Sequence, residues 1–424
     1  MKGFKKEFYI ANLVEMFERL AYYGVFISIT IFLTDVVGFT DIESAWISGL
    51  FSAGLYFLPP FSGAIADKIG FRKAMLFSFS MLTLGYSILG LLPYKLTVIP
   101  ALFIVMIGGS FIKSLITGTV ALTTTEETRA KGYSIFYLMV NIGAFLGKTF
   151  AYPLRLDYGI TTVNIFSGIM SFLALIIVYF FYSNLQKGDN GKSLKDIWGS
   201  LIIVLKNFKL VTIILIVTGF WIIQHQMYAT MPKYIIRIVG KEASPEWIAN
   251  VNPFVVIISV YFVTHFMKKV TSVSSIIVGM LLMPISALIM SLGYQLSNYT
   301  NNVNLFSIIS LHPYTFTMIM GIVFQGLAES FISPRYLEFF SKQAPEGQEG
   351  LYLGFSHLHS FLSSILGFGI SGYLLSWYCP DPKLYSSEQL PYIYQKAHYI
   401  WYYFAAIGGL SALGMIFYKI KFKL

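Results

Sequence analysis

Charged residues are scarce in this sequence. Asp, Glu, Lys and Arg make up 12% of its 424 residues, whereas soluble domains contain about 25%. Hydrophobic residues account for 56% of the chain and aromatic residues for 17%. This balance excludes an ordinary soluble domain and predicts an integral membrane protein.

Cysteine is almost absent as well. The single cysteine, Cys379, allows no internal disulfide, and we expect it to lie in an outer loop where its redox state matters little. His357 and His359 are two residues apart, so they fall on nearly opposite faces of a helix. We therefore expect no shared metal site and favour structural roles for both.

Several catalytic and energy-coupling motifs are missing. No H-E-x-x-H or G-x-S-x-G pattern occurs, which argues against the corresponding hydrolases. A Gly-rich nucleotide loop is also missing, so ATP is not the expected energy source. No pore-lining repeat suggests a channel. We expect a protein that is not an enzyme and needs no cofactor.

Apolar runs of about 20 residues recur along the chain, which is the length of a helix that crosses the hydrocarbon core of a bilayer. Breaks at Gly, Pro and charged residues predict helices at 7–34, 43–66, 72–92, 96–120, 131–154, 162–184, 209–235, 248–268, 272–297, 313–340, 350–377 and 395–419. The polar stretch 183–209 divides them six and six. We predict an all-α membrane protein with twelve transmembrane helices in two six-helix bundles, 1–184 and 209–424, joined by a cytoplasmic linker at 185–208.

Basic residues predict the orientation of these helices. Of the 30 Lys and Arg residues, we place 20 on one side of the membrane, seven on the other and three within the spans. Because Lys and Arg are retained in the cytoplasm, both termini are expected to be cytoplasmic. The net charge of +10 then follows mostly from topology and calls for no nucleic-acid partner.

Six charged residues remain within the predicted spans: Glu15, Glu18, Arg19, Lys113, Lys148 and Glu329. Unpaired, they would cost roughly 15 to 20 kcal/mol on insertion scales. A protein is typically stable by only about 5 to 15 kcal/mol. These side chains must therefore meet partners, water or a substrate, which indicates a transport path.

The first predicted helix carries polar residues at spacings of three and four: Glu15, Glu18, Arg19, Tyr22 and Tyr23. Such spacings place them on one helix face, which we expect to look into a central cavity. The alternative is an ion-pair network that only stabilises the N-terminal half.

The two lysines within spans differ in depth. Lys113 is expected to lie within reach of Glu15 or Glu18, with snorkelling to the membrane surface as the alternative. Lys148 lies toward the outer end of its helix, and for it we favour snorkelling.

Several of these residues resemble a family motif. Residues 15–24 read EMFERLAYYG, which resembles the E-x-x-E-R-F-x-Y-Y-G motif of proton-dependent oligopeptide transporters of the major facilitator superfamily and departs from it only at Leu20. Residues 133–145, YSIFYLMVNIGAF, resemble the family's F-Y-x-x-x-N-x-G signature. Three segments of the second half resemble its motifs in helices seven, eight and ten: Phe220-Trp221, Asn252-Pro253 and 329–334 (ESFISP).

A further segment, 63–73 (GAIADKIGFRK), resembles the loop between helices two and three throughout the superfamily. Asp67 and Arg72 would then form a charge latch that closes the cytoplasmic side. Ordinary positive-inside loop chemistry is the alternative.

The resemblance implies a fold and a set of roles. The fold would be two bundles related by a pseudo-two-fold axis, with the site between them at mid-membrane. Arg19 and Lys113 would meet the carboxylate of the substrate, and Glu329 its ammonium. Five residues would line the pocket: Tyr22, Tyr23, Tyr137, Asn141 and Trp221. Glu15 and Glu18 would carry the coupled proton, because the substrate carboxylate would compete with them for Arg19 and Lys113.

Two features depart from the family. His225 stands where members often carry an acid, and it would serve either as a pH-sensitive group in gating or coupling or as a packing residue. The linker is too short for the two additional helices that many bacterial members carry.

These observations predict a proton-coupled symporter that imports di- and tripeptides by alternating access. A superfamily carrier or exporter for another small organic anion or zwitterion is the alternative. The expected partners are a short peptide, protons and the lipid bilayer. We expect a monomer that crosses a bacterial inner membrane many times.

Overall fold

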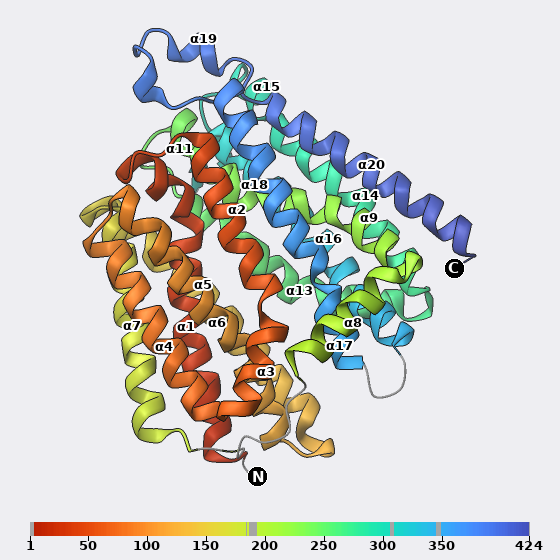
Figure 1. Ribbon diagram of the computed structural model, residues 1–424. Coiled ribbons are helices and arrows are strands. Elements are labelled where there is room, and N and C mark those ends of the chain that lie inside the picture. Colours follow the sequence, from red (N-terminus) through yellow and green to blue (C-terminus); the bar gives the residue numbers. More distant parts are fainter. Residues whose placement is uncertain (1–3, 184, 186–192, 306–308, 345–348, 424) are drawn as a thin grey trace. The chain divides into compact units, whose positions relative to one another are not determined.

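The computed structural model describes residues 4–183, 185, 193–305, 309–344 and 349–423, and almost all of its regular structure is helical (Figure 1). In these residues, 11 helices are long and apolar enough to cross a membrane, or 12 if one bent pair counts as a single span. The chain is therefore a multi-pass membrane protein, and the predicted all-α membrane fold is confirmed.

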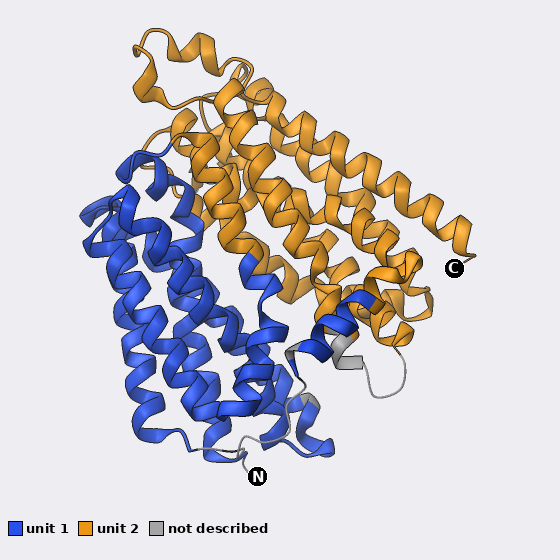
Figure 2. Cartoon of the chain, in the orientation of Figure 1, with its two compact units in different colours: residues 1–39, 54–202 blue, residues 40–53, 203–424 orange. Residues whose placement is uncertain are grey.

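The chain divides into two compact units (Figure 2). Unit 1 comprises residues 1–39 and 54–202, and unit 2 comprises residues 40–53 and 203–424. The second predicted helix thus contributes to both units, with its first part grouped with unit 2. Residues 186–192 of the predicted linker lie outside the described residues.

Unit 1 is built from long helices: α1 (Lys6–Ile31), continued by a π-helical segment (Phe32–Val36), α3 (Pro59–Ile69), α4 (Phe71–Leu91), α5 (Lys95–Thr123), α6 (Glu126–Tyr158), α7 (Ile160–Phe181) and most of α8 (Leu194–Lys206). Within this unit α1 packs against α6 and α7, and α4 packs against α5 and α7.

Unit 2 contains most of α2 (Asp41–Phe57) and the remaining elements: α9 (Phe208–Gln224), α10 (Gln226–Ala229), α11 (Met231–Val239), α12 (Pro245–Ala249), α13 (Val251–Phe266), α14 (Ser272–Ser291), α15 (Gly293–Ser297), β1 (Val303–Leu305), β2 (Ile309–Leu311), α16 (Pro313–Gln343), α17 (Glu349–Ser356), α18 (Leu358–Tyr378), α19 (Leu390–Tyr394) and α20 (Tyr399–Phe422), with 3-10 turns at Met267–Lys269 and Pro382–Leu384. Here α14 packs against α16 and α20, and α9 packs against α18 and α20.

Several predicted single helices are broken. Residues 43–66 form α2 and α3, which meet at an angle of 50° where Pro59 and Pro60 follow Leu58. Proline cannot donate a backbone hydrogen bond and clashes with the preceding turn, so it bends a helix that hydrophobicity alone predicts as continuous. The helix predicted at 209–235 is likewise interrupted, at His225 and Thr230.

Three features were not predicted. The short antiparallel hairpin β1–β2 pairs Val303 with Leu311, and α19 adds a five-residue helix. The predicted linker contains a helix, α8. Cys379 lies between α18 and the 3-10 turn at Pro382–Leu384, and its side chain is fully buried.

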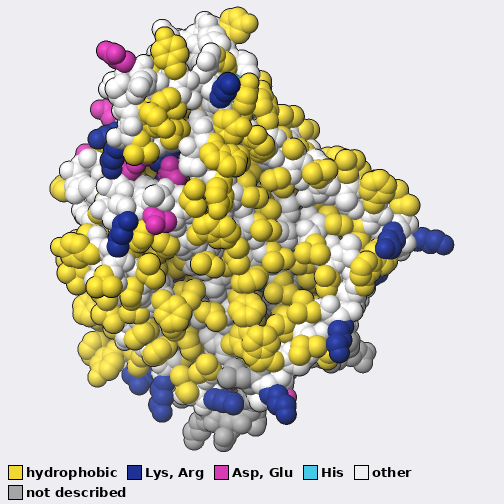
Figure 3. Space-filling view, turned by 45° about the horizontal axis from the view of Figure 1, so that its top comes forward, with side chains coloured by type: hydrophobic (Ala, Val, Ile, Leu, Met, Phe, Trp, Pro, Cys, Tyr) yellow, Lys and Arg dark blue, Asp and Glu magenta, His cyan; other side chains and the backbone are white. Residues whose placement is uncertain are grey.

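The surface agrees with a membrane environment. Hydrophobic side chains cover most of the face shown in Figure 3, and Lys and Arg side chains lie near its edges. Large exposed apolar residues include Leu96 at 86% and Phe180 at 69%. Such apolar surface matches hydrocarbon tails and would be costly in water.

Two glycines set the spacing of α1 and α6. A Cβ atom at Gly147 would lie 2.3 Å from the carbonyl oxygen of Leu20, and one at Gly143 would lie 2.5 Å from that of Met16 and 2.7 Å from the Cβ of Arg19. Only glycine allows the helix backbones to approach this closely. Gly143, the glycine of the F-Y-x-x-x-N-x-G signature, therefore holds α6 against the polar face of α1.

Substitution of Gly147 by Ala should destabilise the protein. Alanine normally favours a helix over glycine, but here its methyl group would force α1 and α6 apart, and such overpacking costs about 1 to 3 kcal/mol. Gly409→Ala is the matched control, because a Cβ at Gly409 on α20 would meet nothing within 4 Å. We expect Gly147→Ala to lower the melting temperature in detergent and Gly409→Ala to leave it unchanged or raise it. Equal melting temperatures would contradict the close approach.

Candidate functional site

Three charged residues of α1 form one cluster in unit 1. Nε of Arg19 lies 3.1 Å from Oε1 of Glu15 and 2.5 Å from Oε2 of Glu18. Both acids are buried, at 2% exposure each, whereas the Arg19 side chain is 17% exposed. The structure thus brings together the three residues that helical spacing grouped.

Hydrogen bonding within this cluster is incomplete. The atom of Arg19 closest to each acid is Nε. Oε2 of Glu15 is buried without a hydrogen bond. Two carboxylates share one guanidinium, so the cluster has one negative charge in excess when all three groups are ionised, and one added proton neutralises it.

Lys113 lies on α5 in the same unit, and its side chain is exposed. Its ammonium lies 5.9 Å from the centre of the Tyr56 ring and makes no ion pair with any acid in the described part of the chain. It is still close enough to Glu15 for a longer-range electrostatic interaction. Lys113 is therefore a cation open to solvent, near the α1 cluster and not locked into it.

The expectation for Lys148 was wrong. Its side chain is 1% exposed, so it does not snorkel to the membrane surface. Its ammonium lies 5.7 Å from the centre of the Tyr23 ring, and the guanidinium of Arg19 lies 5.5 Å from that of Tyr22. The two neighbouring tyrosines of α1 thus each present a ring to a cation, an arrangement that stabilises charge away from water.

The remaining candidate residues of unit 1 lie on α6. Tyr137 is 59% exposed, and Nδ2 of Asn141 donates a hydrogen bond of 2.7 Å to its carbonyl oxygen. Both residues therefore stand on the open face of α6, where a ligand could reach the phenol.

Glu329 is the charged candidate in unit 2. From α16 its Oε2 accepts hydrogen bonds from Nε2 of Gln224 on α9, at 2.9 Å, and from Nδ2 of Asn252 on α13, at 3.3 Å. Two neutral amides thus orient the carboxylate without removing its charge. Asn252 was recognised in a motif without a role, and Gln224 was missed.

Trp221 and two histidines lie near the α9–α18 contact of unit 2. The Trp221 indole stacks on the imidazole of His359, with centroids 5.1 Å apart and planes at 10°. His225 is 5% exposed and lies at the break between α9 and α10, with Nε2 3.4 Å from Oγ of Ser364. The described residues contain no cluster of side chains able to hold a metal ion.

Sequence reasoning missed a buried ion cluster in unit 2. The carboxylate of Asp41, at the start of α2, meets Nζ of Lys233 at 2.8 Å and both terminal nitrogens of Arg237, at 2.8 and 2.9 Å. Lys233 also donates to Ser44 at 2.9 Å, and Arg237 donates to the carbonyl oxygen of Cys379 at 2.6 Å. Both cations belong to the seven basic residues that the sequence places outside the membrane, although their spacing of four residues on one helix face was visible.

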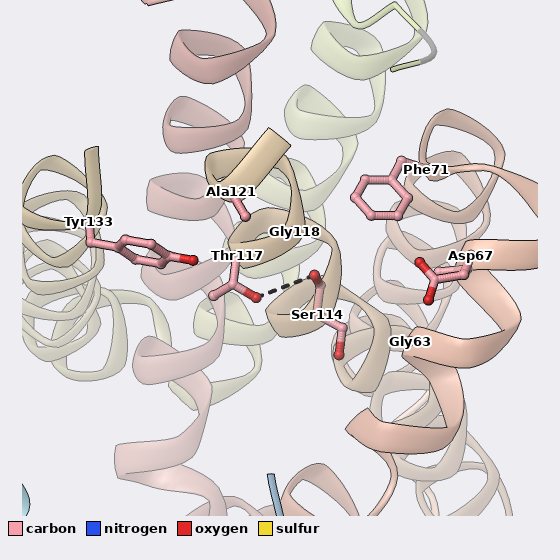
Figure 4. A pocket seen from close by; sticks show the side chains of 9 residues that line it. Gly63, Asp67, Phe71, Ser114, Thr117, Gly118, Ala121 and Tyr133 are labelled. Atoms are coloured by element: carbon pink, nitrogen blue, oxygen red, sulfur yellow. Dashed lines mark hydrogen bonds between the residues drawn. The ribbon is translucent and has the colours of Figure 1, made fainter. Parts of the chain in front are cut away.

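The predicted gating pair is not in contact. The guanidinium of Arg72 donates to the carbonyl oxygen of Tyr179 at 2.7 Å. Asp67 instead lines an open pocket of about 390 Å³ within unit 1, together with Phe71, Ser114 and Tyr133. Figure 4 shows these side chains around the pocket, with Thr117 and Ser114 joined by a hydrogen bond.

The sequence matches a known family. The family model described as Major Facilitator Superfamily matches residues 12–311. The chain belongs to this superfamily. The predicted fold of two six-helix bundles is the fold of that superfamily, and its members are membrane transporters.

Curated relatives of two kinds are similar to the chain. "Dipeptide and tripeptide permease B" of Aeromonas hydrophila is 23% identical over 421 residues, which cover 85% of this chain and 83% of the relative. The permease of that name from Yersinia enterocolitica is 26% identical, over 53% of this chain and 46% of the relative. "Multidrug resistance protein MdtH" of Blochmanniella floridana is 22% identical over 98% of this chain and 94% of the relative. The resemblance to peptide transporters that the motifs predicted is confirmed.

Solved structures share the fold. A peptide transporter called POT in complex with sulfate superposes with a TM-score of 0.74 at 17% identity, over 97% of this chain and 93% of that one. A POT family transporter in complex with 5-aminolevulinic acid gives 0.73 at 16% identity, over 97% and 94%.

Replacement of Asp41 by Asn should strongly destabilise the protein, because it leaves Lys233 and Arg237 buried without their carboxylate. Removing one partner of a buried ion pair costs about 3 to 5 kcal/mol. Glu338→Gln is the control, since Glu338 also meets two cations, Arg335 at 2.8 Å and Lys342 at 2.5 Å, but is 32% exposed, and surface pairs contribute at most about 1 kcal/mol. Thermal unfolding in detergent should show a much larger loss for Asp41→Asn, and similar losses would refute the assignment.

Proposed function

We propose that this protein is a proton-coupled symporter that imports di- and tripeptides by alternating access. The observation that supports it most is the α1 cluster, in which the groups suited to bind a substrate carboxylate and a proton share one guanidinium. A change in charge at either group therefore alters the electrostatic energy of the other.

The cations of unit 1 suit the carboxylate end of a peptide. Arg19 offers the edge of a planar fork that matches a carboxylate, and Lys113 adds a mobile point charge. Both are accessible, in contrast to the buried acids beside them. Tyr22, Tyr23 and Tyr137 would line this half of the pocket together with Asn141, presenting apolar rings with polar ends.

Glu329 in unit 2 suits the ammonium end. Its two amide donors, Gln224 and Asn252, orient the carboxylate. Trp221, stacked on His359, would supply an apolar wall. A zwitterion then finds a partner for each of its ends, one in each unit.

Proton coupling is assigned to Glu15 and Glu18. When the substrate carboxylate binds Arg19, the attraction between the guanidinium and the two acids is shared with a third anion. Protonation of one of the two acids then becomes more favourable, because it reduces the excess negative charge around Arg19. His225, buried next to Ser364, is retained as a secondary coupling residue.

Further parts of the proposal concern topology. We place the two bundles at 1–184 and 209–424 with the linker 185–208 in the cytoplasm, both termini cytoplasmic, and the protein as a monomer in a bacterial inner membrane. Asp67 and Arg72 would act as a gate only in a conformation that brings them together.

A carrier or exporter for another organic anion or zwitterion is the second candidate. The relative named multidrug resistance protein MdtH covers nearly the whole chain, and His225 occupies a position where peptide transporters often have an acid. A binding site without that acid suits a different substrate or direction.

Uptake into proteoliposomes tests the substrate class. With an imposed inward proton gradient, we expect concentrative uptake of a labelled dipeptide. The unlabelled dipeptide should compete, whereas its C-terminally amidated form, which lacks the carboxylate, should not. Uptake that is absent, or equal competition by the two forms, would favour the second candidate, and competition by simple carboxylates would then identify an anion carrier.

Substitution of Glu18 by Gln tests the coupling. We expect proton-driven uptake to be lost, because the variant cannot exchange a proton there, while exchange of labelled for unlabelled peptide in counterflow continues. Glu126→Gln is the control, since Glu126 is an exposed acid in the first turn of α6. Unchanged concentrative uptake by the Glu18→Gln variant would rule out its role.

A further inference from the structure

The helix α8 is apolar on two sides. Its buried side chains are Ile197, Leu201 and Val204. A second apolar stripe, which we call the α8 stripe, consists of Trp198, Ile202 and Leu205, exposed at 49%, 48% and 52%. Their spacings of four and three residues place them along one face of the helix. Exposed apolar side chains in such a row are costly in water.

Basic residues border the stripe. Lys195 precedes Trp198 by three residues and Lys206 follows Ile202 by four, so both lysines lie beside the stripe, and both are exposed. The acid of this helix, Asp196, is used at its start, where it accepts a hydrogen bond of 2.9 Å from the N–H of Ser193. Ile203 lies seven residues after Asp196 and therefore shares its face.

Two features tie α8 to the candidate membrane spans. It ends at Lys206, and the membrane span of α9 begins at Phe208, so only one residue separates the two helices. In unit 1, the Trp198 ring lies 5.2 Å from that of Phe61 and 6.3 Å from that of Phe57, on either side of the bend between α2 and α3. The first part of α8 thus packs on unit 1, and its end leads directly into the span of α9.

We propose that α8 is a membrane-surface helix whose stripe enters the headgroup region and whose lysines, Lys195 and Lys206, bind anionic phospholipid headgroups. An amphipathic helix with Trp and aliphatic side chains on one face and lysines beside them has the chemistry of an interfacial helix. Tryptophan prefers this depth because its ring is apolar and its N–H is polar. Anionic lipids supply the charge that complements the lysines.

Labels at two adjacent positions test this placement in the full chain. Because Cys379 is fully buried, a cysteine introduced by Ile202→Cys or by Ile203→Cys can be labelled with an environment-sensitive fluorophore. In proteoliposomes containing brominated lipid, we expect the label at 202, on the stripe, to be quenched. The label at 203, on the face of Asp196, should be quenched far less. Equal quenching at both positions, or none at 202, would overturn the proposal.

The same label tests the lipid chemistry. Brominated phosphatidylglycerol should associate at position 202 at least about fivefold more strongly than brominated phosphatidylcholine, the gain that one lysine provides near an anionic surface. The double variant Lys195→Gln/Lys206→Gln should reduce this ratio to nearly one. Lys268→Gln/Lys269→Gln, which removes two exposed lysines at the end of α13, should not change it. A ratio that survives loss of Lys195 and Lys206 would show that they do not bind the headgroup.

Discussion

Two buried carboxylates share a single guanidinium on α1, and the rest of unit 1 is arranged around this contact. Charge at the depth of a membrane span is costly, so Glu15, Glu18 and Arg19 must be held where they compensate one another. Gly143 brings the backbone of α6 against the Cβ of Arg19, which restricts where the guanidinium can go. Close helix packing therefore fixes the geometry of the charge cluster.

The helices were predictable because the membrane imposes a length on each apolar run and leaves most charged residues at its ends. Their interruptions were harder to predict. Pro59 and Pro60 lie inside a run that hydropathy extends to residue 66, and His225 interrupts α9 without any Gly or Pro beside it. Hydropathy averages over such residues, whereas the bend depends on a single missing hydrogen bond or on tertiary contacts.

The site was predictable to the extent that it lies on one helix. Spacing alone grouped Glu15, Glu18 and Arg19, because positions three and four residues apart share a helix face. The environment of Lys148 depends on which aromatic ring another helix presents, and the Asp41 cluster joins residues separated by almost 200 positions. Neither contact follows from local spacing. Counting Lys233 and Arg237 among the basic residues outside the membrane concealed that their side chains are buried.

The two buried clusters have opposite excess charge, and this difference separates their roles. On α1, two acids face one cation, so a single proton restores neutrality. In unit 2, two cations face Asp41, and neutrality would require a proton to leave Lys233 or Arg237. Burial by itself lowers the pKa of Arg237, but the charge of Asp41 and the hydrogen bonds that Arg237 donates to it more than reverse this and hold the pKa above its usual range. Asp41 thus keeps Arg237 charged, and the cluster fastens α2 to α11. The excess of acids on α1 is the feature on which the proposed proton coupling rests.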